Sequence, residues 1–404
     1  MGQRKVINRL KKYREEHEER ILPELPEHIF IEILSKIPPK FLRNTFSLVC
    51  KAWYRLIRSL EFMEKINAVQ HKPGIIVSFL VTPNCYIEFP YCKAKLLQID
   101  EKEFDIKLTN FGPTRMGYIR SSCNGLILVS EPRPSTLCVR NMLTGSVLTL
   151  PACPSGCLHS FDECGAGLGF NPVTKEYKVV HIYSDGYGFE IFTIGSDKEW
   201  RQIPGPFKES YERPYDINHF RWGDVDIING HVFHWIVESD EYFISMDIRD
   251  EKLRKTKLPN LRSKIKKMDY EFVEIDGKLS FVYRASSTQI DVWVLTDFGK
   301  QKISKVMVQG EEEQNGSEER KDKLPDFLKL FVVATLRNGE VIVLSRIRNP
   351  GNNESIYLYD MKTREMRKFK MKIKDGTRFI PHTSSLVSWT TEMDLSPNFT
   401  NISL

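Results

Sequence analysis

The chain has 404 residues and a mass of 47.1 kDa, which is longer than a single hydrophobic core usually supports and predicts two or three domains. Its 41% hydrophobic and 28% charged residues, with 23 glycines and 21 prolines, exclude a collagen-like, low-complexity or wholly disordered chain. The 59 basic and 53 acidic side chains leave a net charge of only +6, which gives no general signature of nucleic-acid binding.

Residues 1–20 are strongly charged, and we expect them to form a tail. They lack the apolar segment of a secretory signal, so we expect an intracellular chain, in the cytoplasm and/or the nucleus, with its eight cysteines reduced. The longest apolar runs, such as 126–129 and 330–334, fall far below the ~20 residues of a membrane helix, so we expect no membrane partner.

Residues 21–66 have the pattern of a small helical module. The first apolar segment runs from a Leu-Pro start to a proline stop and contains Leu25, Pro26, Ile29, Ile33, Leu34, Ile37 and Pro38. A second helical stripe, at three- and four-residue steps, contains Phe46, Val49, Trp53, Leu56 and Ile57. Such short helices cannot bury all of this apolar surface against one another, so we expect part of it to be an interface.

After residue 70 the apolar pattern takes the two-residue period of β-strands. Eight segments are predicted as strands: 75–80, 126–129, 177–182, 231–237, 278–283, 290–295, 341–344 and 356–359. Asn-Gly or Asp-Gly pairs, which favour tight hairpin turns, end at Gly125, Gly186, Gly230, Gly277 and Gly339. The intervals from Gly186 to Gly230 and from Gly230 to Gly277 match the ~40 to 50 residues of a four-stranded propeller blade.

This repeat predicts a mainly β fold, with the helical module followed by a β-propeller of roughly seven blades, six to eight being allowed. A pair of twisted β-sandwiches is the alternative. We expect the propeller to span residues 74–392 and a C-terminal tail to span 393–404. The acidic stretch 311–322 and the Cys/Pro/Gly-rich stretch 151–169 are interpreted as connections inserted between strands or blades.

The helical module resembles an F-box, the short unit that docks on a Skp-family adaptor. The resemblance rests on Leu25-Pro26, Ile33-Leu34, Ile37-Pro38, Val49-Cys50-Lys51-Ala52-Trp53 and Leu56-Ile57. It implies an adaptor-binding face made by Leu25, Pro26, Ile29, Ile33, Leu34, Ile37, Pro38, Val49, Cys50, Trp53 and Leu56. The alternative is a helical hairpin that caps the following domain.

The rest of the chain is similar to the plant F-box-associated interaction domain, a kelch-like propeller that recruits a substrate protein. The similar segments are 122–126, 167–172 with 177–180, 229–230 with 234–235, 277–279 and 291–295. The resemblance implies a non-catalytic substrate-recognition subunit of an SCF-type ubiquitin ligase. It would bind a Skp-family adaptor, through it a cullin, and a target protein of unknown identity. No cofactor, metal or nucleic acid is expected.

Two alternative hypotheses are a propeller interaction module that acts without ubiquitin transfer, and a propeller enzyme, which would require a metal or a cofactor. Specificity for a target is expected to lie in loops such as 209–216, 311–322 and 349–354. The motif residues His234, Trp235 and Trp293 lie within strand patterns, where we expect them to pack between blades.

Four possible zinc donors lie close together in the sequence: Cys153, Cys157, His159 and Cys164. Their spacing is not a common pair-of-ligands pattern, so a loop with partly buried cysteines is preferred. The glycines 165, 167 and 169 precede a strand and not a helix, which argues against a phosphate-binding loop. The polar residues of a possible acid/base set are interpreted as parts of turns and strands: Asp224, Asp226, His231 and His234.

Two basic stretches, 252–267 and 362–378, each hold eight Lys or Arg residues. In the second stretch Lys368, Lys370, Lys372 and Lys374 alternate with apolar residues, as on a strand with one lysine face. Lysines of this kind protect an exposed sheet edge from pairing with another chain, and they also suit an acidic partner protein.

Overall fold

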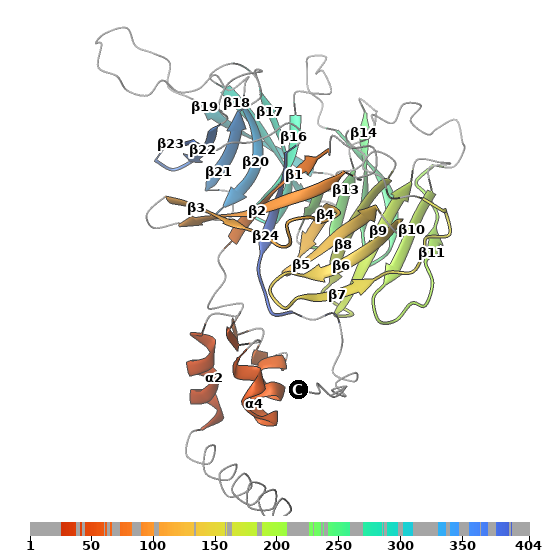
Figure 1. Ribbon diagram of the computed structural model, residues 1–404. Helices are drawn as coiled ribbons and strands as arrows, with labels where there is room; N and C mark the ends of the chain where they lie inside the picture. Colours follow the sequence, from red (N-terminus) through yellow and green to blue (C-terminus); the bar gives the residue numbers. More distant parts are fainter. Residues whose placement is uncertain are drawn as a thin grey trace, which may run out of the picture. The chain divides into compact units, whose positions relative to one another are not determined.

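The computed structural model divides into two compact units, residues 1–71 and 72–404, which are described separately (Figure 1). Leu25, Pro38 and the two expected tails, 1–20 and 393–404, lie outside the described residues, and the predicted domain limits stay predictions. The described residues are 26–37, 41–42, 45–59, 61–62, 65–66, 73–82, 90–100, 105–132, 135–157, 159, 164–183, 188–207, 226–228, 230–235, 237, 241–258, 270–284, 286, 289–297, 302–309, 330–336, 340–346, 355–363, 365–370, 377–387 and 389.

The first unit contains the helices α2 (Glu27–Ser35) and α4 (Lys51–Arg58) and the 3-10 turn η1 (Phe46–Leu48). The second predicted helical stripe is therefore not one helix. Cys50 adopts an extended conformation, with φ −159° and ψ 168°, and caps α4, so the chain breaks between η1 and α4. None of the described helices is both long and apolar enough to cross a membrane.

The second unit is a β-propeller whose 24 described strands form six four-stranded antiparallel sheets. Blade 1 has the order β24 (Arg378–Thr383), β1 (Pro73–Val81), β2 (Tyr91–Asp100) and β3 (Asp105–Asn110). Blade 2 follows with β4 (Tyr118–Cys123), β5 (Leu126–Pro132), β6 (Ser135–Asn141) and β7 (Ser146–Thr149). Blade 3 contains β8 (Cys164–Asn171), β9 (Glu176–Tyr183), β10 (Gly188–Thr193) and β11 (Arg201–Ile203).

Blade 4 contains β12 (Asp226–Ile228), β13 (Val232–Trp235), β14 (Tyr242–Asp247) and β15 (Lys252–Lys257). Blade 5 contains β16 (Tyr270–Ile275), β17 (Lys278–Arg284), β18 (Gln289–Asp297) and β19 (Lys302–Gln309). Blade 6 contains β20 (Leu330–Leu336), β21 (Val341–Arg346), β22 (Ser355–Asp360) and β23 (Met366–Lys370). Strand β23, from the second basic stretch, is the end strand of its sheet, as expected for lysines that protect an edge, and the basic strand β15 is also an end strand.

Six hydrophobic clusters show that the ring of blades is closed. Each cluster joins the facing sides of two neighbouring blades, and the cluster between blades 6 and 1 contains Val343 and Leu358 with Ile75 and Leu97. Strand β24 completes blade 1 by pairing with β1, with Ile380 opposite Ile76 (Figure 1). Each sheet thus buries both faces, which explains why whole strands such as β22 are buried.

The six blades fall within the predicted range and are one fewer than the central estimate of seven. Asn124-Gly125 and Asp276-Gly277 form the expected hairpin turns, with positive φ at both residues of each pair. Gly186 lies between β9 and β10, the second and third strands of blade 3, whereas the other four pairs lie between first and second strands. The interval from Gly186 to Gly230, on which the estimate relied, therefore contains one strand fewer than a full blade, and the repeat is longer than the estimate assumed.

The motif residues on β13 support the packing between blades, as expected. Trp235 is fully buried and stacks on Phe233 with ring centroids 5.7 Å apart, in the cluster between blades 3 and 4. His234 is also buried, and its Nδ1 lies 2.9 Å from the hydroxyl of Ser245. Burial lowers the pKa of His234 to about 3, so this imidazole is neutral at physiological pH and serves as a structural group.

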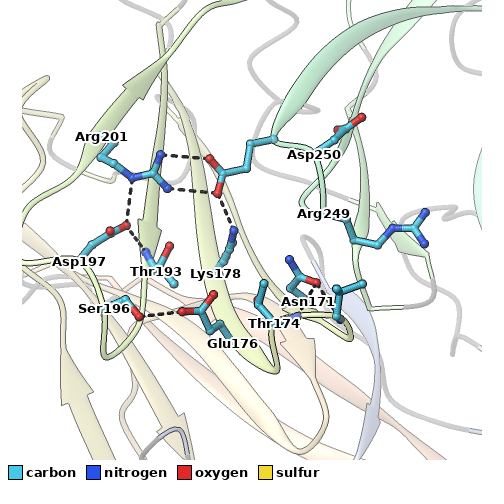
Figure 2. A network of polar contacts seen from close by, with 12 residues as sticks. Asn171, Thr174, Glu176, Lys178, Thr193, Ser196, Asp197, Arg201, Arg249 and Asp250 are labelled. Atoms are coloured by element: carbon cyan, nitrogen blue, oxygen red, sulfur yellow. Dashed lines mark hydrogen bonds and ion pairs between the residues drawn. The ribbon is translucent and has the colours of Figure 1, made fainter.

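A network of charges joins blades 3 and 4 at Glu251, in the turn between β14 and β15. Lys178 of β9 donates to the Glu251 carboxylate at 2.5 Å, and Arg201 of β11 donates through both terminal nitrogens at 3.0 and 3.1 Å. Figure 2 shows Lys178 and Arg201 in this network, together with Asp197, which accepts from Arg201 at 3.3 Å. The Lys178 side chain is only 8% exposed, so Glu251 supplies the opposite charge for a nearly buried ammonium group.

Replacing Glu251 by Gln should lower the free energy of unfolding by about 1–3 kcal/mol at neutral pH, because Lys178 loses its charged partner while staying buried. Burial alone would raise the pKa of Glu251, but the bonds from Arg201 and Lys178 outweigh it and hold this pKa below its usual value. The stabilisation is therefore complete above the ordinary glutamate pKa of about 4.3 and is lost as the pH falls through the lowered value.

Urea unfolding of the wild-type chain and the Glu251→Gln variant at several pH values tests this linkage. The difference in unfolding free energy between them should shrink in acid. The matched control is Asp250→Asn, because Asp250 pairs with Arg254 where both side chains are about two-fifths exposed; its effect should stay below about 1 kcal/mol. A difference that did not change with pH would contradict the assignment.

Candidate functional site

The helical unit exposes a concentrated set of apolar side chains. Of the seven large apolar side chains that are strongly exposed in the described part of the chain, four belong to this unit: Ile33, Phe41, Leu48 and Val49, with exposed fractions of 48%, 54%, 76% and 57%. Leaving such side chains in water gives up the free energy that their burial would contribute. The unit therefore carries a surface suited to binding another protein, which we call the apolar face.

Helix α2 explains how one short helix serves two purposes. Ile31, Leu34 and Ser35 form a buried stripe that packs into the helical unit. Ile29 and Ile33, one turn apart, lie away from that stripe, where Ile33 is exposed and Ile29 is half-buried. The inward stripe holds the helix in the unit, and the outward stripe belongs to the apolar face.

The predicted docking residues are distributed between these two stripes. Pro26, Ile33 and Val49 are exposed, and five others are half-buried: Ile29, Ile37, Cys50, Trp53 and Leu56. Leu34 is only 1% exposed and is buried, as Leu42 and Ile57 are, so we remove it from the apolar face. Whether the remaining residues bind a partner stays a prediction.

Trp53 of α4 is held in place by two aromatic neighbours. The Phe46 ring stacks on it with the two planes nearly parallel and the centroids 5.6 Å apart, and Phe30 contacts it edge-on at 4.7 Å. The indole is thereby fixed before any partner arrives. A rigid, half-buried aromatic loses little conformational entropy on binding, which favours tight association.

Phe41 and Leu48 belong to the apolar face but were absent from the predicted set. Leu48 lies in the turn η1, directly before the break at Cys50. On a continuous helix over residues 46–57, Leu48 would lie on the side away from the predicted stripe. Only the break in the helix turns Leu48 and Val49 outward together.

The possible zinc donors are brought together only in part. Cys153 and His159, on the connection between β7 and β8, lie beside His181 of β9, and all three are buried. Cys157 is half-buried and lies nearby, with its sulfur accepting from the His159 backbone N–H at 3.4 Å. Cys164 opens β8, and its side chain lies outside the described residues. Glycines 165, 167 and 169 lie inside β8, so the last part of the predicted connection 151–169 is a strand, and the glycines form no phosphate loop.

Comparison with known families decides what these two units are. Residues 22–65 match the F-box domain, and residues 90–393 match the F-box associated beta propeller domain. The chain belongs to the F-box-associated β-propeller family. Members of this family combine a helical F-box, here the unit that carries the apolar face, with a propeller, and they are typically non-catalytic receptors.

Three proteins of Arabidopsis thaliana illustrate the relationship. F-box protein At3g07870 is 23% identical over 93% of this chain and 94% of its own length, and F-box/kelch-repeat protein At4g19930 is 25% identical over 87% and 86%. Putative F-box protein At1g33530 is 28% identical over 59% of this chain, and the match spans about half (51%) of that protein. Among solved structures, a chain of a nidogen/laminin complex aligns with a TM-score of 0.44 at 9% identity, over 77% of this chain and 98% of that chain.

Proposed function

We propose that this chain is a substrate-recognition subunit of an SCF-type ubiquitin ligase. F-box proteins with this propeller generally serve as substrate-recognition adaptors of such ligases, and the F-box is the part that binds a Skp-family protein. The single observation that carries the proposal for this chain is the apolar face of its F-box, which leaves Ile33, Phe41, Leu48 and Val49 in water. Through the adaptor, the chain would join a cullin.

The proposed mechanism is proximity and needs no catalytic group on this chain. Binding at the F-box and at the propeller would hold a target protein beside a ubiquitin-charged enzyme carried by other subunits. Tethering raises the effective concentration of the target's lysines, which can increase the rate of transfer without a new chemical step. The expected site of action is the cytoplasm and/or the nucleus.

Co-purification tests the proposal. The full chain, expressed with a Skp-family adaptor and a cullin, should elute with both proteins and should support ubiquitination of a target in a reconstituted reaction. The target can be sought by affinity capture with a chain that starts at Lys72, which retains all 24 described strands but lacks the F-box and so should bind targets without releasing them to the ligase.

The alternative is a propeller that binds its partner without ubiquitin transfer. It is favoured if the full chain never recovers an adaptor while the propeller still captures a partner. The loops in which we expect target specificity, 209–216, 311–322 and 349–354, lie outside the described residues.

A further inference from the structure

A buried group of metal-binding side chains lies between blades 2 and 3. Cys153, His159 and His181 each offer one donor atom, and these atoms lie within 4.8 Å of one another. Two of the residues come from the connection after β7, the last strand of blade 2, and His181 comes from the second strand of blade 3. The F-box function assigns no role to this group.

The distances suit a single metal ion. The Cys153 sulfur lies 3.3 Å from Nε2 of His159, and the ring centroids of His159 and His181 are 4.8 Å apart. In a tetrahedral zinc site with bonds of about 2.3 Å to sulfur and about 2.0 Å to nitrogen, neighbouring donors are roughly 3.5 Å apart. Small adjustments of the side chains would therefore place all three donors around one ion.

Glu190 of β10 orients the imidazole of His181. Its carboxylate lies 3.2 Å from Nδ1 of His181 and also accepts from the backbone N–H and hydroxyl of Ser155, at 3.0 and 3.2 Å. A histidine whose Nδ1–H is held by a carboxylate directs the lone pair of Nε2 to the metal, an arrangement that recurs in zinc proteins. Glu190 and His181 are both fully buried, so this orientation is fixed.

A fourth donor could come from Cys157, whose sulfur lies outside the set of three donor atoms within 4.8 Å of one another. The Cys157 sulfur accepts from the backbone N–H of His159 at 3.4 Å, so it would have to shift to reach an ion held by the other three donors. Cys157 and His159 are only two residues apart, a tight spacing for two ligands of one metal. His159, however, has φ +51°, a left-handed conformation that turns the backbone sharply at this residue.

We propose that Cys153, His159 and His181 bind a zinc ion, with Cys157 as the fourth ligand and Glu190 as a positioning residue for His181. Two sulfur and two nitrogen donors in a closed, buried site are typical of structural zinc. The ion would fasten the connection after β7 to blade 3. Arg120 of β4 donates to the backbone oxygen of His159 at 2.8 Å, which already links blade 2 to this connection.

The test uses the purified full chain and the metals alone. Elemental analysis after incubation with zinc and dialysis should find about one zinc per chain. Cobalt(II) added to the metal-free chain should give the visible absorption bands of a tetrahedral site, together with sulfur-to-cobalt charge-transfer bands in the near ultraviolet. A folded wild-type chain that retains no zinc and gives no such bands overturns the proposal without any variant.

Variants identify the ligands. Cys153→Ser and His181→Asn should each weaken zinc binding by at least about 100-fold, and Glu190→Gln by about 10 to 100-fold with the tetrahedral cobalt spectrum retained. Cys138→Ser is the matched control, because Cys138 is a buried cysteine of blade 2 whose sulfur lies 3.6 Å from the Thr149 hydroxyl. Circular dichroism establishes that each variant is folded. An equal loss of zinc in the control would also overturn the assignment.

Discussion

The double variant Ile33→Glu/Val49→Glu is expected to lose binding to a Skp-family adaptor, with the dissociation constant rising by at least about 100-fold. The two side chains are 48% and 57% exposed, so the charges should leave the F-box folded. Burial of an isoleucine or valine contributes about 1.5–3 kcal/mol each, and every 1.4 kcal/mol lost weakens binding tenfold. Desolvating the new carboxylates would add to this loss.

Titration calorimetry with the purified adaptor and the full chain measures the effect. Val173→Glu is the matched control, because Val173 is also apolar and 76% exposed but lies on the propeller. Its dissociation constant should equal that of the wild-type chain. Unchanged adaptor binding by the folded double variant would mean that the apolar face is not the docking surface.

The sequence predicts that α2 is apolar, but it does not predict which side of the helix is exposed. Residues 29, 33 and 37 follow the period of one helical face; Ile29 and Ile33 lie on the side of α2 away from the buried stripe, Ile37 lies beyond the end of the helix, and their docking role stays a prediction. Leu34 is equally apolar, but it lies in the stripe that packs inward. In a nine-residue helix that is apolar on two sides, the pattern cannot tell which side the rest of the unit covers.

The propeller shows the same limit at a larger scale. All eight predicted strand segments correspond to strands, namely β1, β5, β9, β13, β17, β18, β21 and β22. Strands such as β8 and β15 were not predicted, because their residues are not the apolar and β-branched ones that identify a strand in the sequence. A side chain on Gly169 of β8 would collide with Phe233 and with the backbone of Gly230 in blade 4, so close approach of two blades selects glycine there. Lysines occupy β15 because it is an edge.

The candidate zinc site could be predicted from the sequence only in part. The sequence identified Cys153, Cys157, His159 and Cys164 as possible donors, but their spacing argued against a zinc site. His181 lies inside a strand whose pattern is explained by packing alone, and only the pairing of β9 with β10 brings it beside Glu190. Ligands contributed by different strands carry no fixed spacing along the chain, so a search for ligand spacing cannot detect them.

The second large effect is expected from removing strand β24, without which the propeller should not fold. A chain that ends at Gly376 loses β24, which pairs with β1 and also contacts β4 and β20. It loses Ile380 as well, a residue of β24 that is buried between blades 1 and 2. It also loses the segment after β24, where Asn141 of blade 2 donates to the backbone oxygens of Ser385 and Val387 at 3.0 and 2.9 Å. β24 and β1 are about 300 residues apart in the chain, so residues close to β1 in the sequence cannot take the place of β24 in this sheet.

The control is a chain that ends at residue 390, which keeps every described residue. It should unfold in one cooperative thermal transition at a temperature close to that of the full chain, whereas the chain ending at Gly376 should show no such transition in the propeller. Folding of a ring depends on closing it, because every blade buries both faces only when both neighbours are present. A cooperative transition in the shorter chain would show that five complete blades and an unclosed first sheet are stable by themselves, and that closure by β24 is not what holds the propeller together.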